Sequence, residues 1–296
     1  MSQTEDIDDS AAPLIEHLAE LRTRLIRAVL AFLVGMIICF AFGSAILDFL
    51  LVPIEKTMRQ LGDPNPVMQY TAPQEYFFTL IRISMVGGLA ISFPVIGYQL
   101  WRFVAPGLYS NEKNAFLPFL VASPALFLLG AAFAHYVVVP LAMAFFLGFA
   151  DVPSFVSALV AADGVPAVTD DGIEIVFNGK VNESLDITLK MIVAFGLCFQ
   201  LPVLLTLMGK AGLVSAEGLG GVRKYAVVGI LVLAALVTPP DVITQLILFV
   251  VVFGLYEVSI WLVRGVERRR EAKLRAEGYY DDEDEDDAGF HEDEPK

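Results

Sequence analysis

The strongest constraint on this chain is a series of apolar runs about 20 residues long, which recur along most of its 296 residues. A helix of about 20 residues is long enough to cross the roughly 30 Å hydrocarbon core of a bilayer. The apolar share of the sequence, 56%, also exceeds the roughly 45–50% that is typical of soluble domains. The sequence therefore predicts an all-α membrane protein that crosses the bilayer several times.

Six transmembrane spans are predicted, at residues 25–49, 77–101, 115–149, 185–208, 225–237 and 242–263. The third is too long for one straight crossing, and Pro118, Pro124 and Pro140 within it predict kinks or tilt. Spans 5 and 6 are expected to be short, because about 13 to 15 apolar residues rise only about 20–22 Å as a helix. A proline-rich loop that contains Pro53 is expected after span 1.

A short amphipathic stretch, residues 13–27, precedes the first span. Leucines recur along it at spacings of four, three and four residues and form one apolar stripe on a helix: Leu14, Leu18, Leu21 and Leu25. Glutamate and arginine side chains occupy its wetter face. We therefore expect an amphipathic N-terminal helix that lies at the membrane surface and leads into span 1.

The distribution of Lys and Arg predicts the orientation of the spans. An even number of spans places both termini on one side of the membrane. Fifteen of the 20 basic residues then fall in the tails and links on that side. Because short cytoplasmic loops are enriched in Lys and Arg, we expect both termini to be cytoplasmic.

The net charge of −14 comes from the two ends of the chain. The last twenty residues carry eleven acids and one Lys, and the first nine carry four acids, so the rest sums to zero. We predict an acidic, disordered tail at 1–12, a six-span domain at 13–264 with an outer insert at 151–186, and a basic then acidic tail at 265–296 that is also disordered. Within the insert, Asn178-Gly179 favours a β-hairpin turn.

The sequence contains none of the motifs that would indicate an enzyme. It has no P-loop, no G-x-S-x-G and no H-E-x-x-H, and its three histidines, His17, His135 and His291, lie far apart. Cys39 and Cys198 lie in apolar runs without the spacing of metal ligands, and we expect both to be small buried hydrophobes. The chain is therefore expected to be no enzyme, and to need neither cofactor nor metal nor nucleic acid.

Two polar residues are predicted inside spans, where hydrocarbon makes them costly. Gln200 in span 4 lies just before Pro202. It either satisfies backbone groups that the proline frees or forms a functional polar face, and the sequence does not separate these roles. Glu257 lies in span 6, seven residues before Arg264. A structural interhelical ion pair is favoured for it over a proton relay.

Two carboxylates on the predicted cytoplasmic side have ordinary structural interpretations. Glu20 precedes Arg24 by four residues, which suits a surface ion pair on a helix. Glu112 follows Ser110 and Asn111, which suits an acid in the first turn of span 3. Composition and spacing alone favour these structural roles.

Four segments, in this order along the chain, read PLIEHLAELRTRL, YQLWRFVAPGLYSNEK, FGLCFQLPV and LVTPPDVITQ. Together they resemble the TatC family, the multi-span subunit of the twin-arginine (Sec-independent) protein translocase, over about residues 13–264. The resemblance implies that the protein recognises the twin-arginine signal peptides of folded proteins. It also implies transport across the inner membrane of a bacterium with single-span TatA and TatB type subunits, driven by the protonmotive force, within a larger complex that contains several copies of this chain in contact with membrane lipid.

The resemblance also assigns roles to particular residues. The positions that match signal-binding residues of the family are Glu20, Glu112, Arg22 and Phe103. A guanidinium presents a planar fork that a carboxylate can bind through two hydrogen bonds, which suits the two acids. The positions that match a polar cluster for partner docking are Thr238, Asp241 and Gln245. Gln200 falls where relatives often carry Glu.

One alternative of a different class is a small-molecule secondary transporter that uses Gln200 and Glu257 as a site in the middle of the membrane. Many such transporters carry internal repeats, and the hydropathy of this chain shows no obvious repeat. The sequence therefore favours the translocase subunit.

Overall fold

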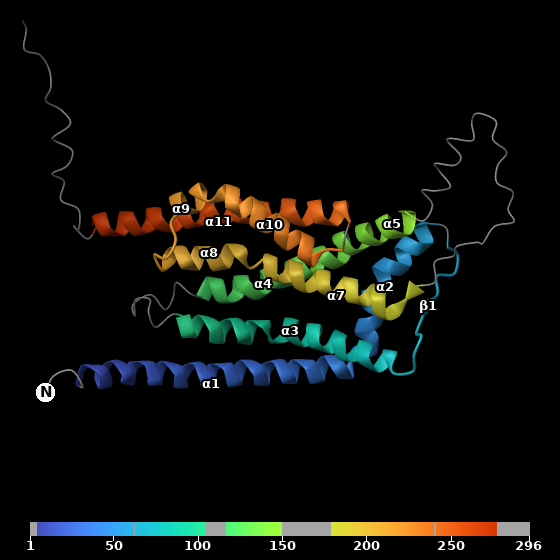
Figure 1. Ribbon diagram of the computed structural model, residues 1–296, viewed down its shortest axis with the longest axis horizontal. Helices are drawn as coiled ribbons and strands as arrows, with labels where there is room; N and C mark the ends of the chain where they lie inside the picture. The colour runs from blue at the N-terminus through green and yellow to red at the C-terminus, as the bar shows by residue number, and fades with distance from the viewer. Residues whose placement is uncertain (1–4, 62, 105–116, 150–178, 240, 277–296) are drawn as a thin grey trace, which may run out of the picture.

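The computed structural model describes residues 5–61, 63–104, 117–149, 179–239 and 241–276. The helices and strands, in chain order, are α1 (Glu5–Ala41), α2 (Gly43–Gln60), β1 (Met68–Gln69), α3 (Glu75–Val104), α4 (Leu117–Phe133), the π-helical turn η3 (Ala134–Val138), α5 (Val139–Phe149), β2 (Gly179–Lys180), α7 (Val181–Cys198), α8 (Leu201–Lys210), α9 (Ala216–Gly221), α10 (Arg223–Val237) and α11 (Val242–Ala276). Most of the helices lie roughly along one axis, side by side (Figure 1).

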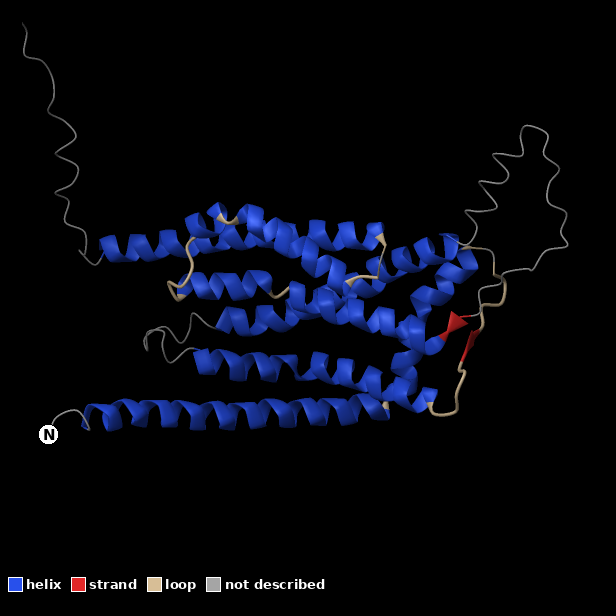
Figure 2. Cartoon of the chain, in the orientation of Figure 1, coloured by secondary structure: helices blue, strands red, loops and turns tan. Residues whose placement is uncertain are grey.

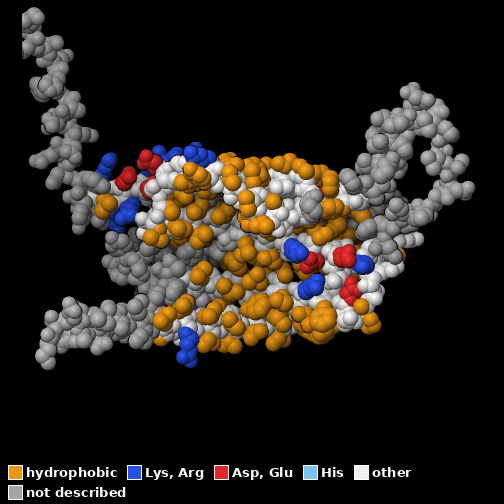
Figure 3. All heavy atoms as spheres, viewed as in Figure 1, with side chains coloured by type: hydrophobic (Ala, Val, Ile, Leu, Met, Phe, Trp, Pro, Cys, Tyr) orange, Lys and Arg blue, Asp and Glu red, His pale blue; other side chains and the backbone are white. Residues whose placement is uncertain are grey.

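Helices make up nearly all of the described chain (Figure 2). Five helical stretches are long and apolar enough to cross a membrane: Leu18–Ala41, Glu75–Leu100, Val121–Gly148, Val181–Lys210 and Val242–Arg275. The prediction of an all-α membrane protein is confirmed. Apolar side chains cover the middle of the surface seen in Figure 3, and charged side chains gather toward its two ends.

The count of six spans depends on α10. This helix has 15 residues and rises about 22 Å, which is less than the roughly 30 Å hydrocarbon core. The predicted shortness of span 5 therefore agrees with the structure, and the sixth crossing stays a prediction. In Figure 1, α1 begins and α11 ends at the same end of the bundle, which we call the terminal end. We call the opposite end, with β1 and β2, the insert end.

The prediction that span 6 is short is wrong for the helix as a whole. Helix α11 has 35 residues and rises about 52 Å, well beyond the hydrocarbon core. Its last two turns consist of Glu, Arg, Lys, Ala and Leu, which are strong helix formers. For the same reason, residues 265–276 are helical and not disordered as predicted.

The N-terminal region also differs from the prediction. Residues 5–12, expected to be disordered, belong to α1, and the amphipathic stretch is not a separate surface helix but part of this one continuous helix of 37 residues.

Span 1 ends earlier than predicted. Helix α1 stops at Ala41, and after Phe42 the chain turns into α2, which crosses the insert end of the bundle (Figure 1). Pro53 lies inside α2 and not in a loop, with a side chain buried in the bundle. The Thr57 hydroxyl donates to the Pro53 carbonyl at 2.9 Å. Burial of the apolar face of α2, including Leu47, Leu50 and Ile54, offsets the missing hydrogen bond of the proline.

Span 3 is irregular, as its prolines predicted. Helices α4 and α5 are joined by the π-helical turn η3, and Pro140 comes directly after it in the first turn of α5. Proline has no backbone N–H, so a normal helical ladder is interrupted there, and a π-helical turn accommodates the change.

Span 4 is broken at Gln200. Helix α7 ends at Cys198 and α8 begins at Leu201, with Pro202 in its first turn. Helix α7 begins at Val181, so the insert predicted at 151–186 ends before that residue. The residues after the predicted Asn178-Gly179 turn are therefore helical from Val181 onward and do not form a hairpin strand. Residues 150–178 lie outside the described part of the chain. Strand β2 instead pairs in parallel with β1, Met68 with Gly179 and Gln69 with Lys180.

Small residues let α1 and α3 approach closely. A methyl group added at Gly35 would lie 2.8 Å from the carbonyl oxygen of Gly88, and one added at Gly88 would lie 2.7 Å from the Cα of Met36. Such close backbone contact is a common way for helices to associate in membranes, where the hydrophobic effect between them is weak. Cys39 and Cys198 are buried free thiols, as expected.

Candidate functional site

Glu20 lies on α1 in the half of the helix nearest the terminal end. Its carboxylate Oε1 accepts a hydrogen bond from Nη2 of Arg24, one turn later. The Glu20 side chain is 38% exposed and that of Arg24 only 10%. The surface ion pair predicted from the spacing is therefore confirmed, with one half-exposed acid and one nearly buried base.

The burial of Arg24 was not predicted. Its Nη1 atom is buried and has no hydrogen-bond partner among the described residues. A buried guanidinium nitrogen without a partner is unfavourable, which leaves Arg24 dependent on Glu20 for compensation. Glu20 Oε2 takes no hydrogen bond from the described residues, so part of this carboxylate is open to a further donor.

Arg22 is exposed on the same helix. It follows Glu20 by two residues, and positions two apart on a helix point to different sides. The structure therefore does not bring the Arg22 and Glu20 side chains together.

The other two predicted signal-binding residues are only partly placed. Glu112 lies outside the described residues, and the side chain of Phe103 is also not described, although its backbone belongs to α3. Helices α1 and α3 run antiparallel and meet at Gly35 and Gly88 (Figure 1). Glu20 lies fifteen residues before Gly35 on α1, and Phe103 lies fifteen residues after Gly88 on α3, both toward the terminal end. Because both helices rise about 1.5 Å per residue, these two backbone positions lie at the same height.

Gln200 joins two broken spans. Its Oε1 accepts a hydrogen bond from the Ser123 hydroxyl at 2.7 Å, and its Nε2 donates to the Ser123 carbonyl at 2.8 Å. Ser123 precedes Pro124 in α4, so the pair ties together two helices at their proline positions. The Gln200 side chain therefore bonds a neighbouring helix and not the backbone groups that Pro202 frees. Of its two predicted roles, local capping of those groups is wrong.

Thr238 and Asp241 occupy the turn between α10 and α11, and Gln245 follows in the first turns of α11. Asp241 caps α11: its Oδ2 accepts from the Thr244 backbone N–H at 2.7 Å, and its Oδ1 accepts from the Thr244 hydroxyl. The Thr238 hydroxyl donates to the Ala234 carbonyl at 2.8 Å. Both Thr238 and Asp241 are buried, whereas Gln245 is half-buried and its amide has no hydrogen bond within the described part of the chain. Gln245 is therefore the member of this cluster with free hydrogen-bonding capacity.

Glu257 forms the interhelical ion pair favoured above. Its Oε2 lies 2.8 Å from Nη2 of Arg223, which links α11 to α10. Arg264, the residue at helical spacing from it, is not its partner. A paired, partly exposed carboxylate is poor support for a substrate site in the middle of the membrane.

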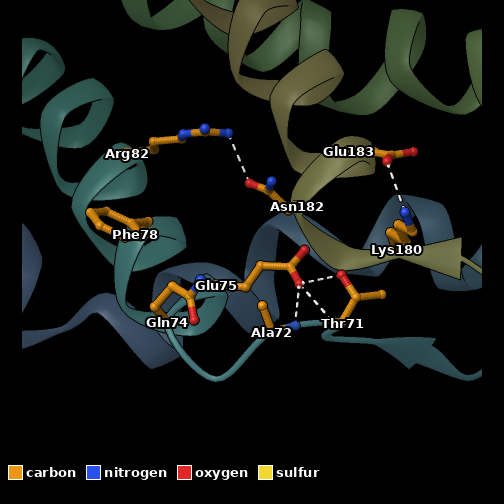
Figure 4. A pocket seen from close by; sticks show the side chains of 9 residues that line it. All are labelled: Thr71, Ala72, Gln74, Glu75, Phe78, Arg82, Lys180, Asn182 and Glu183. Atoms are coloured by element: carbon orange, nitrogen blue, oxygen red, sulfur yellow. Dashed lines mark hydrogen bonds and ion pairs between the residues drawn. The ribbon is translucent and has the colours of Figure 1, made fainter.

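A second polar group, missed in the sequence, lies at the insert end (Figure 4). Glu75 accepts hydrogen bonds from the Thr71 and Ala72 backbone N–H groups, at 2.6 and 3.2 Å, before α3. Across a cavity of about 330 Å³, Arg82 bonds Asn182 at 2.8 Å. The Glu75 bonds hold the loop before α3 against the first turn of that helix. The Arg82–Asn182 bond joins α3 to the start of α7, so both sets of contacts have a structural role.

Comparison with known proteins identifies the family. The family model described as "Sec-independent protein translocase protein (TatC)" matches residues 16–250. A Sec-independent protein translocase protein TatC of Magnetococcus marinus is 42% identical over 283 residues, which cover 93% of this chain and 95% of that protein. One from Aquifex aeolicus is 38% identical over 264 residues, covering 89% and 100%.

A solved structure agrees with these sequences. The crystal structure described as that of the twin arginine translocase receptor TatC superposes with a TM-score of 0.67 at 39% identity. The superposition covers 85% of this chain and 99% of that one. Fold and sequence therefore point to the same family across nearly the whole described bundle.

Proposed function

The chain belongs to the TatC family, and from this premise we propose that it is the subunit of the Sec-independent translocase that binds twin-arginine signal peptides. The family assignment rests on the match over residues 16–250 and makes the chain a multi-pass membrane component of that translocase. Beyond the family, we propose the residues that recognise the signal, the partner subunits and the energy source for transport. The protein acts in it as a receptor and scaffold and not as an enzyme.

The observation that carries the proposal is that the Glu20 carboxylate already holds a guanidinium, that of Arg24, and keeps one oxygen open. An ionised carboxylate accepts about four hydrogen bonds, so Glu20 can take a second guanidinium from a signal peptide. Hydrogen bonds between ionised groups are roughly twice as strong as neutral ones. The fork of Arg engages both oxygens, which the single ammonium of Lys does not.

Phe103 and Glu112 complete the proposed binding site. Phe103 lies on α3 at the height of Glu20, and we assign it packing against the apolar part of the signal. Glu112 follows in the link to α4 and takes the second arginine. Arg22 is exposed on a different side of α1, and a role for it in signal binding rests on the resemblance alone.

The proposed orientation places the terminal end in the cytoplasm and the insert end outside the inner membrane of a bacterium. It rests on the excess of Lys and Arg in the tails and links at the terminal end. Signal peptides then meet Glu20 from the side on which cargo is made and folded.

For partner docking we propose the surface around the α10–α11 turn. The Gln245 amide there has no hydrogen bond from the described residues, and Thr238 and Asp241 hold the turn. Single-span TatA and TatB type subunits would pack against the short helix α10 and the start of α11. Transport of folded proteins in a complex with several copies of this chain would draw on the protonmotive force.

The proposal is tested by binding of a fluorescent twin-arginine peptide to the purified protein in detergent. Wild type is compared with Glu20→Gln, with Glu112→Gln, and with a peptide in which Lys-Lys replaces Arg-Arg. We expect each change to weaken binding by at least about tenfold, because each removes a charged hydrogen-bonding partner.

The matched control is Glu55→Gln. Glu55 pairs with Arg59 at the same i, i+4 spacing, 3.0 Å apart, but on α2 at the insert end. Its substitution should leave peptide binding unchanged. Equal binding by wild type, Glu20→Gln and Glu112→Gln, in protein with an unchanged unfolding temperature, would refute the proposed site.

A further inference from the structure

A groove between α4, α8 and α11 lies near the terminal end, away from Glu20 and from the α10–α11 turn. It encloses about 480 Å³, which is within the roughly 300–1,000 Å³ of small-molecule sites. Its walls on α4 and α8 are apolar: Phe119, Ala122, Leu126, Pro202 and Val203. The hydroxyl of Thr206, which also lines it, already donates to the Pro202 carbonyl. These two helices therefore offer a ligand almost no hydrogen bonds.

The third wall, α11, is apolar at one end and basic at the other. Trp261 and Leu262 continue the apolar lining, and Arg264, Arg268 and Arg269 follow toward the terminal end. The three arginines are exposed, and none of them has an ion-pair partner among the described residues. Three exposed guanidinium groups at one end of an apolar groove are complementary to a ligand with the opposite arrangement, an anion joined to an apolar chain.

The height of these residues matches a lipid headgroup. From Val242, at the start of α11, to Arg264 the helix rises about 33 Å, close to the roughly 30 Å thickness of the hydrocarbon core. Trp261, 71% exposed, lies one turn before Arg264, and Trp is enriched at this interface of membranes. The arginines therefore lie at the level of phosphates and the groove beside the level of acyl chains.

We propose that this groove binds one anionic phospholipid from the leaflet at the terminal end. Its phosphodiester lies among Arg264, Arg268 and Arg269, and one acyl chain lies in the groove along Leu126, Val203 and Trp261. Arginine suits a phosphate because its fork donates two hydrogen bonds at once. Basic pockets between spans on the cytoplasmic side are known to favour anionic headgroups. The bound lipid fixes the contact of α11 with α4 and α8.

The test uses lipids with brominated acyl chains, which quench Trp fluorescence on close approach. The chain has two tryptophans, Trp101 and Trp261, so a Trp101→Phe protein leaves Trp261 as the only reporter. The protein is reconstituted in vesicles that mix phosphatidylglycerol with phosphatidylcholine, with either lipid brominated. We expect the binding constant at Trp261 to favour phosphatidylglycerol by about tenfold.

Two double variants that each remove two positive charges distinguish binding in the groove from a general electrostatic attraction to α11. Arg268→Gln with Arg269→Gln should abolish the preference, whereas Arg270→Gln with Arg275→Gln, on the same helix but outside the groove lining, should retain it. Equal effects of the two pairs would overturn the proposal, because the preference would then reflect only the net charge of the helix.

A third variant, Ala122→Phe, fills the groove and leaves every arginine in place. It should reduce quenching by brominated phosphatidylglycerol, and unchanged quenching would mean that no acyl chain enters the groove. Glycerol phosphate added at millimolar concentration should not compete; effective competition would identify a free-phosphate site. Protection of Trp261 from both lipids would mean that protein covers the groove and would also overturn the proposal.

Discussion

Arg24 donates a hydrogen bond to Glu20 one turn earlier on α1, although the guanidinium is nearly buried and the carboxylate half-exposed. Glu20 is the acid proposed to bind the signal peptide, and Arg24 carries the same guanidinium group as the arginines of that peptide. In the resting protein, Arg24 therefore occupies part of the carboxylate that an incoming arginine would use.

Removal of this internal competitor should strengthen signal binding. Arg24→Gln leaves Glu20 without a guanidinium partner and removes a buried nitrogen that lacks a hydrogen bond. We expect the affinity for a twin-arginine peptide to rise about twofold to fivefold, within the range of a surface ion pair. Fluorescence anisotropy measures this. The gain should disappear in Arg24→Gln/Glu20→Gln, and its persistence there would contradict competition for Glu20.

Close packing of α1 on α3 should tolerate no side chain at Gly88. Gly88→Val places a β-carbon 2.7 Å from the Cα and N of Met36 and should destabilise the bundle by about 1–3 kcal/mol. Gly254→Val is the control, because no atom of the described residues lies within 4 Å of a β-carbon added there. Thermal unfolding in detergent checks both, and equal loss in the two variants would argue against the observed α1–α3 contact.

The reciprocal hydrogen bonds between Gln200 and Ser123 should appear as an energetic coupling. A double-mutant cycle with Gln200→Leu and Ser123→Ala tests the bond from the Ser123 hydroxyl and is expected to give about 0.6 kcal/mol, the mean for polar pairs in membrane bundles, and no more than about 1.7 kcal/mol. The free energies of unfolding of the four proteins provide this value. A coupling near zero would show that the two side chains act independently.

The helix cap at Asp241 predicts a local effect. Asp241→Ala removes the acceptor for the Thr244 N–H and should cost about 1 kcal/mol, whereas Asp241→Asn retains a capping oxygen and should cost less. Hydrogen exchange of the first turn of α11 reports the difference. Equal exchange in the two variants would exclude a capping role.

The long apolar runs were sufficient to predict the class of fold, because hydrophobic length alone specifies a membrane helix. The irregularity of span 3 was also predicted, since proline acts on the backbone locally. Where long-range packing determines the secondary structure, the prediction from the sequence was wrong. Pro53 was placed in a loop, but burial of α2 against the bundle keeps it helical.

The ends of helices were predicted least well. The start of α1 at Glu5 and the end of α11 at Ala276 lie in charged segments without apolar periodicity, so hydropathy placed the boundaries near the membrane. Within the candidate site, spacing predicted the Glu20–Arg24 pair but not the burial of Arg24, which depends on what packs around α1. The height shared by Glu20 and Phe103 likewise follows from the contact of Gly35 with Gly88.

A double-mutant cycle across the interface measures whether the Glu20 carboxylate binds an arginine of the signal peptide. Wild type and Glu20→Gln are each titrated with an Arg-Arg peptide and with peptides in which one arginine at a time is Lys. We expect one of the two Arg→Lys changes to weaken binding to wild type much more than to Glu20→Gln, with a coupling energy of at least about 1 kcal/mol. If both changes weaken binding equally in the two proteins, Glu20 does not contact either arginine, and the proposed site is wrong.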